Sequence, residues 1–130
     1  MSIKKLLKPE VIAVIGASDR AGFSKNTSKN LLYTEEPKRV YFINPNKDEL
    51  YGKKCFKSVT DLPESPDLVI LCVNAGLVPQ MLREAAAVGC HSAVIYASGY
   101  GETGKPEGYK LQEELSALCK ELDMLVMGPN

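Results

Sequence analysis

Apolar runs alternate with amphipathic segments along the chain. Five short runs are apolar almost throughout, which is typical of strands that are covered on both faces of a sheet. They lie at Val11–Ile15, Val40–Ile43, Leu68–Val73, Ala93–Ala97 and Met124–Met127. Between them, the composition and the spacing of leucines and alanines predict three helices. These helices lie at Ser24–Tyr33, Val78–Val88 and Tyr109–Leu122.

The order of these elements predicts the fold class. Apolar strands that alternate with helices favour a parallel sheet with right-handed crossovers. We expect an α/β fold, a Rossmann-like, doubly wound parallel sheet of five strands in the order 3-2-1-4-5. Its ligand cleft would lie at the carboxyl ends of the first and fourth strands. The connection Pro45–Pro66 is long for this fold, and its Tyr51-Gly52 and Lys53-Lys54 pairs predict a small hairpin or turn and then a short helix.

Length and composition narrow the class of protein. The chain has 130 residues, 16 Lys+Arg, 16 Asp+Glu, four Cys and one His. This length suits a single domain, and without a basic excess nucleic acid is not an expected partner. The cysteines form no C-x-x-C pair, and one histidine cannot complete a zinc set with them. Because the sequence shows neither a signal peptide nor a membrane-spanning run, we expect a cytoplasmic protein that binds no membrane.

The first candidate site follows the first strand. A glycine turn between a buried strand and a helix N-terminus offers backbone N–H groups to a phosphate, and serines add hydroxyl donors. The candidates are Gly16, Ser18, Gly22 and Ser24. Their spacing differs from both G-x-G-x-x-G and the P-loop pattern, so a plain strand-to-helix loop is the alternative.

Three further strand ends would face the same cleft. Asn44 stands where an NAD-binding domain usually has an acidic residue, and Lys47 is a cation near the expected place of an adenosine ribose. Small residues end the next two strands, at Val73–Gly76 and Ala97–Glu102, and would let an extended ligand approach the backbone. Ordinary turns and a solvated lysine are the alternative. His91 should lie at the opposite edge of the sheet, and we expect no catalytic residue and no metal ligand.

Ten short motifs occur in a specific order over nearly the whole chain. They are Leu7–Pro9, Val11–Ser18, Asn44–Asn46, Tyr51-Gly52, Asp61–Pro63, Pro66–Val69, Val73–Ala75, Ala97–Gly99, Gly101-Glu102 and Gly128–Asn130. Together they resemble the N-terminal CoA-binding domain of NDP-forming acyl-CoA synthetases, such as the ADP-forming enzymes. These synthetases are relatives of the succinyl-CoA synthetase α subunit. The resemblance implies that the chain binds CoA or acyl-CoA.

The resemblance also implies a role for each candidate position. Gly16, Ala17 and Ser18 would contact the CoA diphosphate, with Gly22 in the same loop. Asn44, Pro45 and Lys47 would flank the adenosine and its 3′-phosphate. Val73, Asn74 and Ala75 would line the adenine or pantetheine path, and Ser98 and Gly99 would lie near the thiol arm. The family often has another glycine after this loop, whereas this chain has Phe23–Asn26 there. In this segment Ser24 is followed by Lys25, which would supply a cation for the phosphate.

The family's phosphorylated histidine lies in a later domain, and His91 does not match it. We therefore expect residues 1–130 to be an N-terminal domain of a longer acid–thiol ligase, which binds CoA but does not catalyse ligation alone. Downstream domains or a partner subunit of the synthetase would complete the enzyme, and fusion to a protein acetyltransferase is another possible context. Two alternatives stay open. One is an NAD(P)-binding module of an oxidoreductase or redox sensor, and the other is a flavodoxin-like interaction domain without a ligand.

Overall fold

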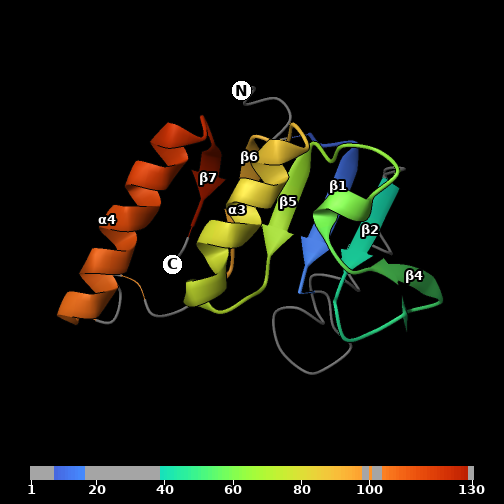
Figure 1. The fold of residues 1–130 in the computed structure, drawn as a ribbon, viewed down its shortest axis with the longest axis horizontal. Coiled ribbons are helices and arrows are strands. Elements are labelled where there is room, and N and C mark those ends of the chain that lie inside the picture. Colours follow the sequence, from blue (N-terminus) through green and yellow to red (C-terminus); the bar gives the residue numbers. More distant parts are fainter. Residues whose placement is uncertain (1–7, 17–38, 98–99, 101–103, 129–130) are drawn as a thin grey trace.

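One sheet runs through the part of the chain that the structure describes (Figure 1). The structure is a computed structural model, and it describes residues 8–16, 39–97, 100 and 104–128. The strands are β1 (Val11–Ile15), β2 (Arg39–Ile43), β3 (Glu49–Leu50), β4 (Lys53–Phe56), β5 (Leu68–Leu71), β6 (Ser92–Ile95) and β7 (Leu125–Met127). They stand in the order β3-β4-β2-β1-β5-β6-β7. Neighbouring strands are parallel, except β3 and β4, which form an antiparallel hairpin.

Two helices cover one face of the sheet. Both α3 (Val78–Ala87) and α4 (Pro106–Glu121) have a proline in the first turn, where the helix does not use its N–H group. Leu82 of α3 and Leu115 of α4 pack in one apolar cluster with alternate residues of the central strands, such as Val69. These contacts bury one face of each helix, and in α4 this face is the leucine stripe that predicted the helix in the sequence.

The opposite face of the central strands forms a second apolar cluster. β1 is buried along its whole length, so its residues avoid water on both faces. Val14 and Phe42 belong to this second cluster, whereas Ala13 and Ile15 point to the face of α3 and α4. A continuous apolar run is what a strand buried on both faces requires. The expected α/β, Rossmann-like fold with a mostly parallel sheet is confirmed.

The predicted order 3-2-1-4-5 of five strands is wrong. The third predicted strand is β5, and it pairs with β1, from Ile12 opposite Leu68 to Ile15 opposite Leu71. The place beyond β2 belongs instead to β4, which pairs with β2 in parallel and extends into the hairpin with β3. Because β4 occupies the free edge of β2, the chain returns to the other side of β1. The strands beside β1 are thus β2 and β5, and the fourth predicted strand, β6, is not its neighbour.

The connection between β2 and β5 does contain the expected hairpin and short helix. Tyr51 and Gly52 form the hairpin turn, and both have positive φ angles, of 51° and 75°. This combination fits a type I′ turn, whose twist matches that of the flanking strands. The short helix is the 3-10 turn η1 (Val59–Asp61), which begins at the capping hydroxyl of Ser58.

The remaining predicted helix, Ser24–Tyr33, lies outside the described residues. Among the helices that are described, none is both long and apolar enough to cross a membrane. The described ranges also hold no group of three His, Cys, Asp or Glu side chains placed to bind a metal ion.

Candidate functional site

The ends of five parallel strands lie side by side at one edge of the sheet. Four residues, each directly after a strand, continue the hydrogen-bond ladder there. The backbone N–H group of each donates a hydrogen bond to a carbonyl oxygen of the neighbouring strand. These bonds run from Asn44 to Phe56 (2.9 Å), from Gly16 to Ile43 (2.9 Å), from Cys72 to Ile15 (2.8 Å) and from Tyr96 to Leu71 (2.8 Å). We call the row Asn44, Gly16, Cys72 and Tyr96 the carboxyl edge. Figure 1 shows the arrowheads of β1, β2 and β5 pointing to this side, where α3 also begins.

Gly16 brings the ends of β1 and β5 into close contact. Its φ angle is +84°, and a Cβ atom at this position would lie 2.3 Å from the backbone oxygen of Cys72. No side chain fits at such a distance, so the fold itself requires glycine here. Gly16 has the positive φ angle that a tight turn needs, and the neighbouring strand end at Cys72 leaves no room for a side chain there.

Asn44 shapes the loop that follows β2. Its side-chain oxygen Oδ1 accepts a hydrogen bond from the backbone N–H of Asn46 at 2.8 Å, and its carbonyl accepts one from Lys47 N–H at 3.4 Å. Such a turn is a common role for asparagine. The exposed Pro45 lies inside the turn, and Lys47 is half-buried beside it. Asn44, Pro45 and Lys47 therefore lie together at the carboxyl edge.

Lys57 holds the same loop from the other side, and the sequence analysis did not identify it. Its Nζ donates to the carbonyl oxygen of Lys47 at 3.1 Å and to Oδ1 of Asp48 at 3.0 Å. Lys57 directly follows β4, so it stands beyond the carboxyl end of that strand. Lys57 could have been identified from the sequence only if Lys53–Phe56 had been recognised as a parallel strand beside β2.

The segment after β5 forms a second wall of this edge. Val73 and Ala75 are half-buried and pack against the cluster beneath α3, while Asn74 is exposed and precedes the 3-10 turn η2 (Ala75–Leu77). The chain then enters α3 at Val78. The helix N-terminus gives this side of the edge a partial positive charge.

The thiols in and near the edge are not activated. Burial raises the pKa of Cys72 from its ordinary value of 9.0 to about 11. Burial also raises the pKa of Cys55 in β4 and, away from this edge, that of Cys119 near the end of α4. A thiol with a raised pKa is protonated at neutral pH and is a poor nucleophile.

Polar side chains at the opposite edge of the sheet form hydrogen bonds with the backbone. Nδ1 of His91 lies 2.8 Å from the carbonyl oxygen of Leu122, just before β6, as expected for a histidine away from the cleft. Asp67 accepts hydrogen bonds from the N–H groups of Glu10 and Val11 and so fixes the start of β1. These residues lie at the other end of the strands from the carboxyl edge.

Seven of the predicted site residues lie outside the described residues. They are Ala17, Ser18, Gly22, Ser24, Lys25, Ser98 and Gly99. Tyr100 is described, and it is one of the largest fully buried side chains, 1% exposed and packed in the cluster with α3 and α4. The sequence analysis missed this buried tyrosine because it stands in a glycine-rich stretch that favours a surface loop.

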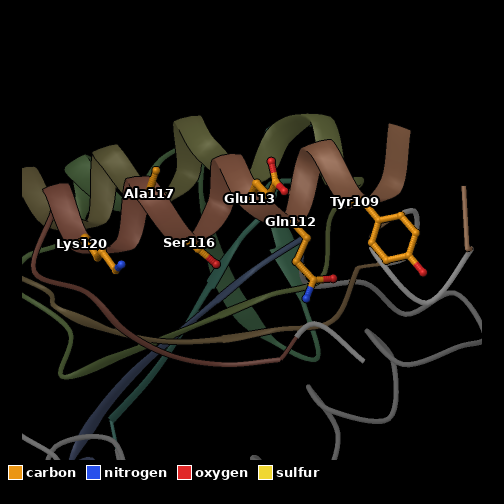
Figure 2. A pocket seen from close by; sticks show the side chains of 6 residues that line it. All are labelled: Tyr109, Gln112, Glu113, Ser116, Ala117 and Lys120. Atoms are coloured by element: carbon orange, nitrogen blue, oxygen red, sulfur yellow. The ribbon is translucent and has the colours of Figure 1, made fainter. Parts of the chain in front are cut away.

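A separate groove runs along α4 (Figure 2). The described residues that line it come from this one helix, and they are Tyr109, Gln112, Glu113, Ser116, Ala117 and Lys120. This stripe lies on a different side of α4 from the buried Leu115 and Leu118. None of the predicted site residues that the structure describes lines the groove.

Comparisons with known proteins agree on one family. A family model described as a CoA binding domain matches residues 10–130. A trans-feruloyl-CoA synthase of an unknown prokaryotic organism is 41% identical over 129 residues, which are 98% of this chain and 18% of that protein. The α subunit of an ADP-forming acetate–CoA ligase II of Pyrococcus furiosus is 38% identical over 94% of this chain and 26% of the subunit.

Solved structures give the same result. A dinucleotide-forming acetyl-coenzyme A synthetase 1 of Candidatus Korarchaeum cryptofilum, in complex with phosphate and ADP, superposes with a TM-score of 0.88 at 32% identity. The match covers 99% of this chain and 27% of that protein. The chain thus spans between 18% and 27% of the length of these relatives.

Proposed function

Since this chain belongs to the CoA-binding domain family, we propose that it holds CoA or acyl-CoA at its carboxyl edge, as a module of an ADP-forming acyl-CoA synthetase. The observation that carries the location is the hydrogen-bonded row of Asn44, Gly16 and Cys72 at the ends of β2, β1 and β5. In open parallel sheets, ligands bind beyond the carboxyl ends of the strands, where the chain connections diverge to opposite sides. In this sheet that point lies between β1 and β5.

The chemistry of the edge suits the charged parts of CoA. CoA carries a diphosphate and a 3′-phosphate, so its site needs positive potential. The N-terminus of α3 and the ammonium group of Lys47 belong to this edge and provide that potential. We propose that the loop Gly16–Lys25 receives the diphosphate, with Gly16, Ala17, Ser18, Gly22, Ser24 and Lys25 as its contacts. Asn44, Pro45 and Lys47 then face the adenosine and its 3′-phosphate.

The uncharged arm of CoA has a matching surface. Val73 and Ala75 are half-buried apolar residues beside the exposed Asn74, and they suit the pantetheine chain. We assign Ser98 and Gly99 to the thiol end, on their resemblance to the family. Cys72 at this edge stays protonated at neutral pH, because burial raises its pKa to about 11. The contribution that we propose for this chain is therefore to position the CoA thiol. Fixing a nucleophile near its electrophile lowers the barrier by proximity.

The whole enzyme is part of the proposal. The chain spans 18% to 27% of the relatives described above, one of which is named as an α subunit. We propose that residues 1–130 act as one CoA-binding domain in the cytoplasm, together with downstream domains or a partner subunit that carry out the acyl transfer. The NAD(P)-binding alternative receives no support from these similarities.

Isothermal titration of the chain with CoA, dephospho-CoA, NAD and NADP tests the ligand. We expect heat of binding with CoA, weaker binding of dephospho-CoA, and none with NAD. Binding of NADP without binding of CoA would overturn the proposed function. Equal affinity for CoA and dephospho-CoA would remove the contact that we assign to Lys47 and the 3′-phosphate.

A further inference from the structure

We propose that Lys57 is a positioning residue that gives the site its preference for the 3′-phosphate of CoA. It would do so by fixing the loop that carries Lys47. This inference deepens the proposed function and rests on it. The loop runs from Asn44 to Asp48, between β2 and the hairpin, and we call it the adenosine loop.

The adenosine loop is fixed at both ends by backbone hydrogen bonds. At its start, Asn44 N–H donates to the carbonyl of Phe56 at 2.9 Å. At its end, the carbonyl of Asp48 accepts from Cys55 N–H at 2.9 Å. Lys57 supplies the contact between these two anchors, because its Nζ reaches the carbonyl of Lys47 at 3.1 Å. The position of the Lys47 backbone therefore depends in part on the side chain of Lys57, which directly follows the neighbouring strand β4.

The two lysine side chains act in the same small region. Cys55 lies in β4, and Lys57 directly follows that strand, two residues further along the chain. Burial raises the pKa of the Cys55 thiol, and the charges of both Lys57 and Lys47 oppose that rise. Both ammonium groups are thus close enough to act on one buried thiol. This agrees with the hydrogen bond that joins Lys57 to the Lys47 backbone.

The ammonium group of Lys57 has two contacts, and they differ in how much they hold the loop. The ammonium group of Lys57 is paired with the carboxylate of Asp48 at 3.0 Å. That carboxylate is 97% exposed, so the ion pair is screened by water and adds little by itself. The hydrogen bond to the Lys47 carbonyl is therefore the contact through which Lys57 holds the loop. A lysine whose backbone is fixed loses less conformational freedom when its ammonium group meets a phosphate.

The 3′-phosphate distinguishes CoA from dephospho-CoA, so the ratio of their affinities measures this contact. We would compare Lys57→Met with Lys57→Arg, which keeps a donor for the Lys47 carbonyl. The matched control is Lys54→Met. Lys54 is exposed on the same hairpin and lies over the ring of Phe56, 5.1 Å from its centroid, so its loss removes one charge but leaves the adenosine loop in place.

Titration calorimetry of the 130-residue chain and its variants with both ligands gives the ratio. We expect Lys57→Met to lower the preference for CoA by about tenfold, as for one charge-assisted hydrogen bond, with little change for dephospho-CoA. Lys57→Arg should recover most of the preference, and Lys54→Met should keep it. If Lys57→Met does not fold, Lys57→Gln gives the same test, because its side chain is one bond shorter and carries no charge.

The outcomes separate the two proposals. Wild-type protein that does not bind CoA contradicts the proposed function. Wild-type protein that prefers CoA, with a Lys57→Met variant that keeps the same preference, contradicts only the role of Lys57. An equal loss for both ligands would mean that Lys57 stabilises the fold without selecting the phosphate. An equal loss of preference in Lys54→Met would mean that general charge, and not the loop, sets the ratio.

Discussion

A Cβ atom at Gly16 would lie 2.3 Å from the backbone oxygen of Cys72, so the ends of β1 and β5 touch at the centre of the carboxyl edge. This contact decides how substitutions at Gly16 must be interpreted. A larger residue there would disturb the two central strands before any ligand arrives. Loss of CoA binding in such a variant would therefore not identify Gly16 as a phosphate contact.

Gly16→Ala should destabilise the protein far more than a matched glycine substitution. Gly52 has a similar φ angle of +75°, but a Cβ atom there would meet nothing within 4 Å. We expect Gly52→Ala to lower the free energy of unfolding by about 1 kcal/mol, from backbone strain alone. Gly16→Ala adds a collision with the backbone, and we expect about 3 kcal/mol or more. Urea denaturation measures both, and equal effects would contradict the contact between Gly16 and Cys72.

The raised pKa of Cys72 predicts how stability depends on alkaline pH. In the unfolded chain this thiol loses its proton near its ordinary pKa of 9.0, whereas in the folded protein it holds the proton to about 11. The unfolded state is thus favoured as pH rises between these values, and below pH 9 the thiol contributes no pH dependence. We expect the free energy of unfolding to fall less steeply from pH 8.5 to 10.5 in Cys72→Ala than in wild type, because the variant has no thiol that loses its proton on unfolding. An equal fall of the free energy of unfolding in both proteins over this pH range would show that the thiol is not buried.

Asp67→Ala should weaken the fold without weakening CoA binding. The carboxylate accepts hydrogen bonds from the N–H groups of Glu10 at 3.0 Å and Val11 at 3.2 Å, at the amino end of β1. We expect the loss of these bonds to lower the free energy of unfolding by about 1–2 kcal/mol. Since the carboxyl edge is at the other end of the strand, the Kd for CoA measured well below the melting temperature should not change. A large rise in Kd with normal stability would place the ligand at the amino end.

The sequence predicted the central strands because their environment leaves a clear pattern. Val11–Ile15 and Leu68–Leu71 are buried on both faces, so every position is apolar. β4 has no such pattern, because two of its four residues are lysines. Nζ of Lys53 donates to the carbonyl of Val40 at 2.6 Å and lies over the ring of Phe42, so this charged residue belongs to the sheet. The sequence analysis predicts a small hairpin or turn at this place but no strand of the main sheet, and the error in strand order follows from that.

The part of the candidate site that lies on the central strands could be predicted from the sequence, and the part that depends on β4 could not. Gly16, Asn44 and Val73 follow parallel strands, and the carboxyl ends of parallel strands share an edge, so their proximity follows from the fold class. Lys57 depends on β4 and could not be identified without it. Tyr100 packs in the core cluster with residues of α3 and α4, which are distant in sequence, and the local composition around it does not reveal such contacts.

The location of the CoA site is tested most directly by mapping backbone amide shifts in ¹H–¹⁵N NMR spectra during titration with CoA. We expect the largest changes at the carboxyl edge, at Gly16, Asn44, Lys47 and Asn74. The amides of His91 and Glu10 at the opposite edge, and those of Tyr109 to Lys120 along the groove of α4, should change little. Changes confined to the groove or to the opposite edge, with the carboxyl edge unaffected, would contradict the proposed site.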